Sequence, residues 1–107
     1  MNKQEVIQAV RQEYDEYKSR MLAEDALFIY DHSYEITIVK IFMQHIVYDQ
    51  YLDDFTDDEF VILYNGTNGK ILNYLTQEYW TSVYSIDRGE DVTALIDYCI
   101  RQLREVL

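Results

Sequence analysis

The chain has 107 residues and carries 20 Asp and Glu side chains against nine Lys and Arg, which gives a formal net charge of −11. This acidity excludes nucleic-acid binding through a basic surface, since the phosphate groups would be repelled. One cysteine excludes an internal disulfide framework and a multi-cysteine zinc site. With 49% hydrophobic residues the chain can still build a core, so we expect a single helical domain over residues 1–107.

We expect no targeting or membrane-spanning segment. The first residues are polar and run directly into a helical pattern, with no apolar signal core and no small-residue cleavage site. The longest segment without a charged residue is Phe60–Gly69, which is far short of the roughly 20 apolar residues that a membrane span needs. The expectation is therefore a soluble, cytoplasmic protein that does not bind membranes.

The absence of proline is typical of a chain that is mostly helical, because proline interrupts helix interiors. We expect an all-α fold, a compact bundle of about five helices joined by short loops. The first helix is predicted over residues 3–22, where apolar side chains recur every three or four residues and so share one stripe. This stripe consists of Ile7, Val10, Tyr14, Tyr17 and Met21.

Residues 24–48 are predicted to form the next helical segment, with a break or bend near Asp31-His32-Ser33. The segment is apolar on two faces, which is typical of a helix at the centre of a bundle. One face holds Leu27, Tyr30, Tyr34, Ile38 and Ile41, and the other holds Ile36, Val39, Phe42 and Ile46. The β-branched run over residues 36–39 also permits a strand. We favour a helix, because no Gly or Asn turn interrupts the segment.

A linker over residues 49–55 leads to the sequence Thr56-Asp57-Asp58-Glu59, which is typical of a helix start. In such a capping box the threonine hydroxyl accepts from the backbone N–H of residue 59, and the glutamate accepts from that of residue 56. We expect a short helix that ends at Asn65-Gly66 in a left-handed C-cap.

Two more helices are predicted after the second Asn-Gly pair of the chain, Asn68-Gly69. The first covers residues 70–83, and its apolar side consists of Ile71, Leu72, Leu75, Tyr79 and Trp80. A loop over residues 84–90 follows. The last helix begins at Asp91, and its apolar face consists of Val92, Leu95, Ile96, Cys99, Leu103 and Val106.

The negative charge is concentrated in one part of the chain. Between Ile41 and Gly69 there are six acids and no base, and all six acids lie within residues 49–59, flanked by Tyr48 and Phe60. Acids near a helix start stabilise it by about 0.3–1 kcal/mol each, which accounts for two or three of them as ordinary surface charge. The alternative interpretation is an acidic patch with exposed aromatic side chains that binds a basic partner. The predicted partner-binding residues are Asp49, Tyr51, Asp53, Asp54, Phe55, Asp57, Asp58 and Glu59.

No motif in the sequence indicates an enzyme. His32 and His45 lack the spacing of a zinc or iron site and are interpreted as structural, and Cys99 is interpreted as part of the core. The sequence contains no glycine-rich phosphate loop and no serine nucleophile elbow. We therefore expect no catalytic residue, no metal and no cofactor. A dispersed carboxylate site stays open as an alternative, because the chain has 20 acids.

The eleven tyrosines are the second unusual feature of the composition. Many fall at the spacing of a helical core, where the ring is buried and the hydroxyl needs a partner. Tyr51 and Tyr84 lie outside the predicted apolar stripes and are candidates for a protein interface, where tyrosine is enriched.

Three segments carry a resemblance to a known family. They are Ile29-Tyr30-Asp31-His32-Ser33-Tyr34-Glu35-Ile36, Glu13-Tyr14-Asp15 in the first helix, and Leu95-Ile96-Asp97-Tyr98-Cys99-Ile100 in the last. Together they resemble a family of small, acidic, helical domains of unknown function that is common in Firmicutes and their plasmids and phages. The resemblance spans most of the chain and supplies no catalytic residues.

In size and acidity the chain is also similar to type II-A anti-CRISPR proteins, some of which are acidic inhibitors of the single-subunit RNA-guided nuclease. This similarity implies that the partner is the CRISPR-associated nuclease or its guide-RNA complex. It further implies that the acidic patch blocks guide RNA loading or DNA engagement. The alternative is an acidic adaptor or antitoxin of a mobile element, with another basic protein as its partner.

Overall fold

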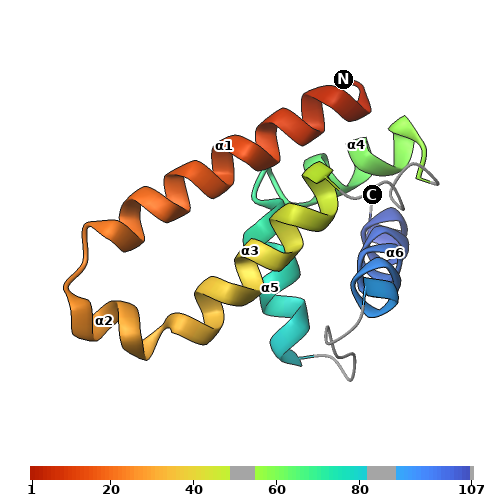
Figure 1. Ribbon diagram of the computed structural model, residues 1–107. Coiled ribbons are helices and arrows are strands. Elements are labelled where there is room, and N and C mark those ends of the chain that lie inside the picture. Colours follow the sequence, from red (N-terminus) through yellow and green to blue (C-terminus); the bar gives the residue numbers. More distant parts are fainter. Residues whose placement is uncertain (49–54, 82–88, 107) are drawn as a thin grey trace.

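The computed structural model describes residues 1–48, 55–81 and 89–106 (Figure 1). Its helices are α1 (Lys3–Leu22), α2 (Ala26–Asp31), α3 (Ser33–Tyr48), α4 (Asp57–Gly66), α5 (Ile71–Thr81) and α6 (Gly89–Val106). These three ranges contain no strand, which confirms the expected all-α bundle. They contain six helices where about five were predicted, because the bend near His32 separates α2 from α3.

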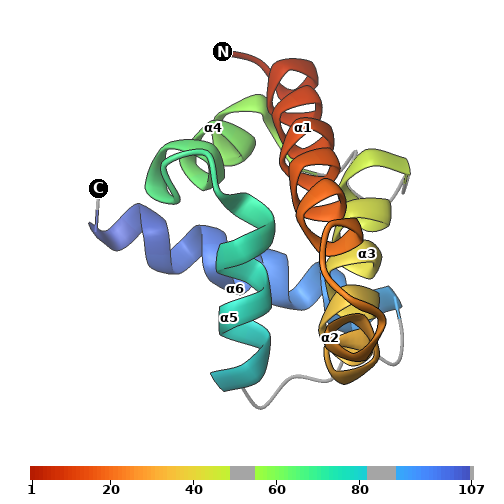
Figure 2. The ribbon, with the colours of Figure 1, turned by 90° about the vertical axis from the view of Figure 1, so that its left-hand side faces the viewer.

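Helix α5 packs against α1, α3 and α6. Helices α1 and α3 lie against each other and diverge toward α2, which connects them at one end of the molecule (Figure 1). Helix α5 packs against α3, and α6 crosses α5 and packs against α4 (Figure 2). The N-terminus lies beside the start of α4, at the end of the molecule opposite to α2 (Figures 1 and 2).

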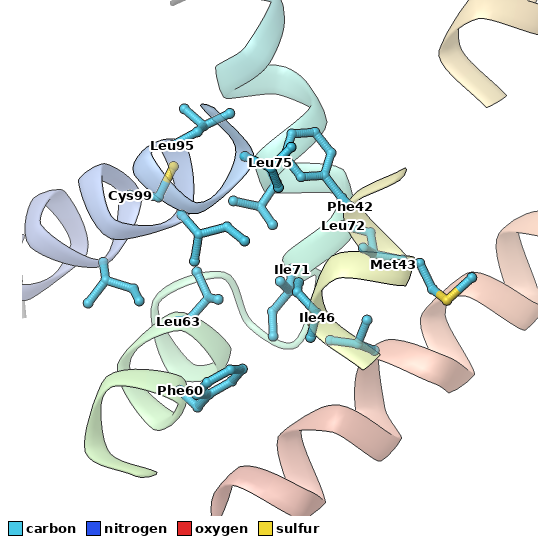
Figure 3. Packing of buried hydrophobic residues seen from close by; sticks show 14 of the residues in the cluster. Phe42, Met43, Ile46, Phe60, Leu63, Ile71, Leu72, Leu75, Leu95 and Cys99 are labelled. Atoms are coloured by element: carbon cyan, nitrogen blue, oxygen red, sulfur yellow. The ribbon is translucent and has the colours of Figure 1, made fainter. Parts of the chain in front are cut away.

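The core consists of apolar side chains from every helix except α2. Phe42 of α3, Phe60 of α4 and Leu75 of α5 are fully buried where these helices converge on Cys99 of α6 (Figure 3). Full burial of one such large side chain contributes about 1.5–3 kcal/mol, so this cluster is the main source of stability. In α1 the buried residues are Val6 and Val10, and Val6 is absent from the predicted stripe.

Helices α1 and α4 begin with the side-chain caps that satisfy their first N–H groups. Asn2 and Glu5 form a capping box at α1, in which the backbone N–H of Glu5 donates to Asn2 Oδ1 at 2.9 Å. The predicted capping box of α4 is confirmed, with the N–H of Glu59 donating to Thr56 Oγ1 at 3.2 Å. Polar caps of this kind contribute about 1 kcal/mol each.

The segment between α1 and α4 is helical, as favoured, but part of the predicted apolar face is exposed to solvent. The buried residues of α3 are Ile38, Val39, Phe42, Met43 and Ile46. Leu27, Tyr30 and Tyr34 are 70%, 77% and 57% exposed. For Leu27 and Tyr30 the reason is the break at His32, because α2 does not continue the faces of α3. The His32 ring stacks on Phe28, and its Nδ1 lies 2.9 Å from the Phe28 carbonyl oxygen.

The turn between α4 and α5 also differs from the prediction. Gly66 is the last residue of α4, and the left-handed residues are Asn68 (φ 54°) and Gly69 (φ 80°). A Cβ atom on Gly66 would lie 2.8 Å from Cδ2 of Leu103, so this glycine permits the close approach of α4 to α6. In the first Asn-Gly pair, Gly66 therefore permits helix packing. In the second pair, Asn68 and Gly69 form the turn that reverses the chain.

The last two predicted helices are confirmed in type and differ at their ends. Helix α5 is described as far as Thr81, and α6 begins at Gly89, two residues before the predicted Asp91. Most of the predicted loop over residues 84–90 lies outside the described residues. Trp80, predicted on the apolar side of α5, is 49% exposed, whereas Ile100 of α6 is buried without having been predicted.

The conformation of Gly69 makes it sensitive to substitution. We expect Gly69→Ala to lower the free energy of unfolding by about 1–2 kcal/mol, because an L-residue is strained in the left-handed region. A Cβ there would also lie only 3.3 Å from Cε2 of Tyr64. Urea denaturation measures the change. Asn68→Gly is the control and should not destabilise the fold; an equal loss in both variants would contradict this explanation.

Candidate functional site

The structure describes half of the predicted partner-binding residues. Asp49, Tyr51, Asp53 and Asp54 lie outside the described residues, as does Tyr84. The described ones are Phe55, Asp57, Asp58 and Glu59. The three acids form the first turn of α4, where the partial positive charge of the helix start favours them.

Two of these three acids already have structural roles. The carboxylate of Glu59 accepts from the backbone N–H of Thr56 at 3.0 Å. Oδ1 of Asp57 accepts from the backbone N–H of Lys3 at 3.1 Å, which ties the start of α1 to the start of α4. Asp58 is exposed and makes no hydrogen bond or ion pair with another described residue. Among the described acids of this segment, Asp58 is the one whose charge is left for a partner.

Two of the described aromatic residues beside the acids are buried and do not belong to the expected exposed surface. Phe55 and Phe60 are 7% and 1% exposed, and their rings meet edge to face with centroids 6.3 Å apart. Nζ of Lys3 lies 5.4 Å from the centre of the Phe60 ring. These two rings anchor the beginning of α4 to the core. The expectation that Phe55 is exposed is therefore wrong. Tyr48, by contrast, is 69% exposed.

A different aromatic surface was missed. The rings of Tyr34, Tyr79 and Trp80, here called the aromatic face, join the start of α3 to the end of α5. The hydroxyl oxygens of Tyr34 and Tyr79 lie 2.9 Å apart, and the Trp80 ring centre is 5.4 Å from that of Tyr34 and 5.3 Å from that of Tyr79. Helical spacing assigned all three rings to the core, because spacing does not tell a buried ring from one at the edge of the bundle.

The groove between α1 and the α4–α5 turn combines a large volume with charged side chains. It is open and polar, with a volume of about 990 Å³, and Glu13, Glu16, Arg20 and Lys70 are among its lining residues. Burial raises the pKa of the Glu13 carboxyl above its ordinary value, although hydrogen bonds from the backbone of Leu72 and Asn73 act in the opposite direction. Perturbed carboxyl groups in clefts are candidates for acid–base catalysis.

The hydrogen bonds of Glu13 indicate a structural role instead. Its two carboxylate oxygens accept from the backbone N–H groups of Leu72 at 2.8 Å and Asn73 at 3.0 Å. A side chain of α1 thus caps the first turn of α5, 59 residues away in the sequence. Such an acceptor satisfies two of the N–H groups that a helix start leaves without partners. Glu13 is engaged in holding two helices together.

The environment of the single cysteine and the arrangement of metal-ligating side chains can both be examined in the described ranges. Cys99 is fully buried, and burial raises the pKa of its thiol to about 12, which is the opposite of what a nucleophile needs. Within the described ranges, no group of three or more His, Cys, Asp or Glu side chains is arranged to hold a metal ion. No helix in those ranges has the length and apolar character to cross a membrane.

Substitution of Glu13 tests its structural role. We expect Glu13→Ala to lower the free energy of unfolding by about 1–3 kcal/mol, because two backbone N–H groups lose their acceptor. Glu13→Gln keeps one acceptor oxygen and should lose less. Glu16→Gln, on the exposed side of α1, is the control and should change little. Urea denaturation compares the three variants, and a loss in Glu16→Gln as large as that in Glu13→Ala would contradict the capping role.

The pH dependence of the same variants follows from the raised pKa. The folded protein retains the Glu13 proton at a pH where the unfolded chain, with a pKa near 4.5, has lost it. The stability of the wild type relative to Glu13→Gln should therefore fall as the pH rises through this interval toward neutrality. Urea unfolding of both proteins at a series of pH values measures the difference, and a constant difference would contradict the assignment.

The burial of Cys99 predicts an inert thiol. In the folded protein we expect no reaction with a thiol-specific reagent at neutral pH, because the thiol is covered and its pKa is raised to about 12. In denaturant the single thiol should react fully. Absorbance of the released chromophore follows both reactions, and rapid modification without denaturant would show that Cys99 is accessible.

Comparison with known proteins does not identify a relative. No protein-family model matches the chain, and neither a curated protein nor a solved structure matches it. The resemblance of residues 29–36 to small acidic helical domains therefore stays a prediction, and so does the similarity to anti-CRISPR proteins.

Proposed function

We propose that this chain is a protein-binding domain that occupies a basic surface of its partner, and that the partner is the RNA-guided nuclease of a type II-A CRISPR system. The observation that supports the proposal is the distribution of charge. Residues 41–69 contain six acids and no base, within a chain whose net charge is −11. Of these acids, Asp58 is exposed at the first turn of α4, directly after the acids of residues 49–54.

The chemistry of the partner explains why such a surface is suitable. The nuclease holds guide RNA and target DNA in positively charged channels and reads the adjacent motif with arginine side chains. A folded protein with clustered carboxylates competes with phosphate groups for those cations, and electrostatic steering increases its rate of association. Bound in this way, the domain blocks guide loading or DNA engagement without any chemical step.

Interference with plasmid uptake tests this function. Cells with a type II-A system that express the chain should accept a targeted plasmid as readily as an untargeted one. Undiminished targeting would contradict the proposal. Co-purification identifies the partner in the same cells: recovery of the nuclease supports the proposal, whereas recovery of a different basic protein supports the alternative of an adaptor or antitoxin.

Charge reversal tests the acidic segment itself. The variant combines three substitutions, Asp53→Lys, Asp54→Lys and Asp58→Lys. It leaves Asp57 and Glu59 unchanged, because their hydrogen bonds stabilise the start of α4. We expect the triple variant to bind the nuclease about threefold to a hundredfold more weakly, since each exposed ion pair contributes a few tenths of a kcal/mol to about 1 kcal/mol.

The matched control reverses three exposed acids elsewhere, in Asp15→Lys, Glu16→Lys and Glu105→Lys combined. It changes the net charge by the same amount and should retain most of the affinity. Titration calorimetry with the purified nuclease measures both variants. Equal losses would mean that total charge matters and that residues 49–59 are not the binding segment.

A further inference from the structure

The aromatic face lies at the edge of the bundle and is exposed to solvent. Tyr34 is 57% and Trp80 is 49% exposed, and on the neighbouring α2 Leu27 and Tyr30 are 70% and 77% exposed. The end of α5 lies on the side of the molecule away from the N-terminus (Figures 1 and 2), and its rings contact Tyr34 at the start of α3. Large side chains gathered on a surface in this way indicate a binding site.

The rings of this surface are already held in place. The contact between the hydroxyl groups of Tyr34 and Tyr79 and the tilted packing of both rings on Trp80 connect α3 to α5. The Tyr79 ring also packs edge-on against the buried Phe42, with ring centres 6.5 Å apart. A partner would therefore meet pre-ordered rings, which reduces the entropy lost on binding.

The two stretches of sequence that carry these rings contain acids and no Lys or Arg. Residues 21–39 and 71–81, which include α2, the first half of α3 and all of α5, contain no Lys or Arg. They contain five acids, of which Asp25 caps α2 and Glu35 accepts from the Tyr17 hydroxyl of α1 at 3.4 Å. The other three are Glu24, Asp31 and Glu78. Arg20, the nearest base before this stretch, has its guanidinium 5.9 Å from the Tyr17 ring on α1.

These observations decide between possible occupants. A second copy of the chain would bring another net charge of −11 against the same acids, and an anionic membrane would be repelled in the same way. A cationic protein segment is complementary both to the acids and to the rings, because Arg and Lys stack favourably on Trp and Tyr faces.

We infer that the aromatic face is a docking site for an arginine- or lysine-rich segment of the partner protein, with a guanidinium or ammonium group over the rings of Trp80 and Tyr34. The inference rests on the proposed function in taking the partner to be a basic protein. It adds a second contact, at the end of the molecule opposite to the start of α4.

Tryptophan fluorescence tests the site directly, because Trp80 is the single tryptophan of the chain. The probe is a synthetic oligo-arginine peptide, titrated at low salt, with an oligo-glutamate peptide as the negative control. We expect a saturable change of the Trp80 emission with the arginine peptide only. Calorimetry in parallel measures binding in variants without the tryptophan.

The variants separate the aromatic face from general attraction to an acidic protein. We expect Tyr34→Leu and Trp80→Leu each to weaken peptide binding about threefold, the effect of one exposed cation–π contact. Tyr48→Leu removes an aromatic ring that is more exposed, at 69%, but lies at the far end of α3, and this variant should bind like the wild type. Circular dichroism confirms that each variant is folded.

Two results would overturn the inference. One is the absence of peptide binding. The other is binding with unchanged Trp80 emission and equal affinity in all three variants. If, in the second case, the triple charge reversal at residues 53, 54 and 58 lowers the affinity, the acidic segment keeps its role and the aromatic face has none. Plasmid interference decides the proposed function independently of either result.

Discussion

The need to satisfy the first N–H groups of each helix determines how this acidic chain can fold. Carboxylates supply many of the acceptors. Glu5 completes the cap of α1, Asp25 caps α2, Glu59 completes the cap of α4, and Glu13 reaches across from α1 to cap α5. At the starts of α1, α2 and α4 the negative charge stabilises the helix. At the start of α5 burial raises the pKa of Glu13, so there the hydrogen bonds of the carboxyl group stabilise the helix and its charge does not. Some of the carboxylates thus serve as helix caps. Others, such as Asp31 and Asp58, are exposed on the surface.

Local features of the fold could be predicted from the sequence. The bounds of α1, the capping box at Thr56 and the bend near His32 depend on residues within one or two turns of each other, and all three are confirmed. The two Asn-Gly pairs were harder to assign. Both are typical of helix ends, and the difference between them comes from Leu103, which packs against Gly66 from the far end of the chain.

Which aromatic side chains are exposed was harder to predict than the helices, because exposure depends on tertiary packing. Phe55 was expected in a polar linker and is buried, whereas Tyr34 and Trp80 were expected in the core and are exposed. Apolar periodicity identifies the side of a helix that carries large side chains, but the amount of cover depends on where neighbouring helices end. The cap that Glu13 supplies to α5 likewise depends on tertiary packing, because its partners lie 59 and 60 residues away.

The separation of the two candidate contact surfaces determines how long the cationic surface of the partner must be. The start of α4 and the aromatic face lie toward opposite ends of a molecule with principal extents of 40 × 29 × 27 Å (Figure 1). A partner that contacts both must present cationic side chains over a comparable length, as a nucleic-acid channel does and a short peptide does not.

The most direct measurement is therefore a competition experiment. Binding of the purified chain to the type II-A nuclease is compared before and after the nuclease is loaded with guide RNA and target DNA. The proposal predicts tight binding to the empty nuclease and loss of binding when the channels are filled. Absence of binding to the empty nuclease, or equal binding to both forms, would contradict it.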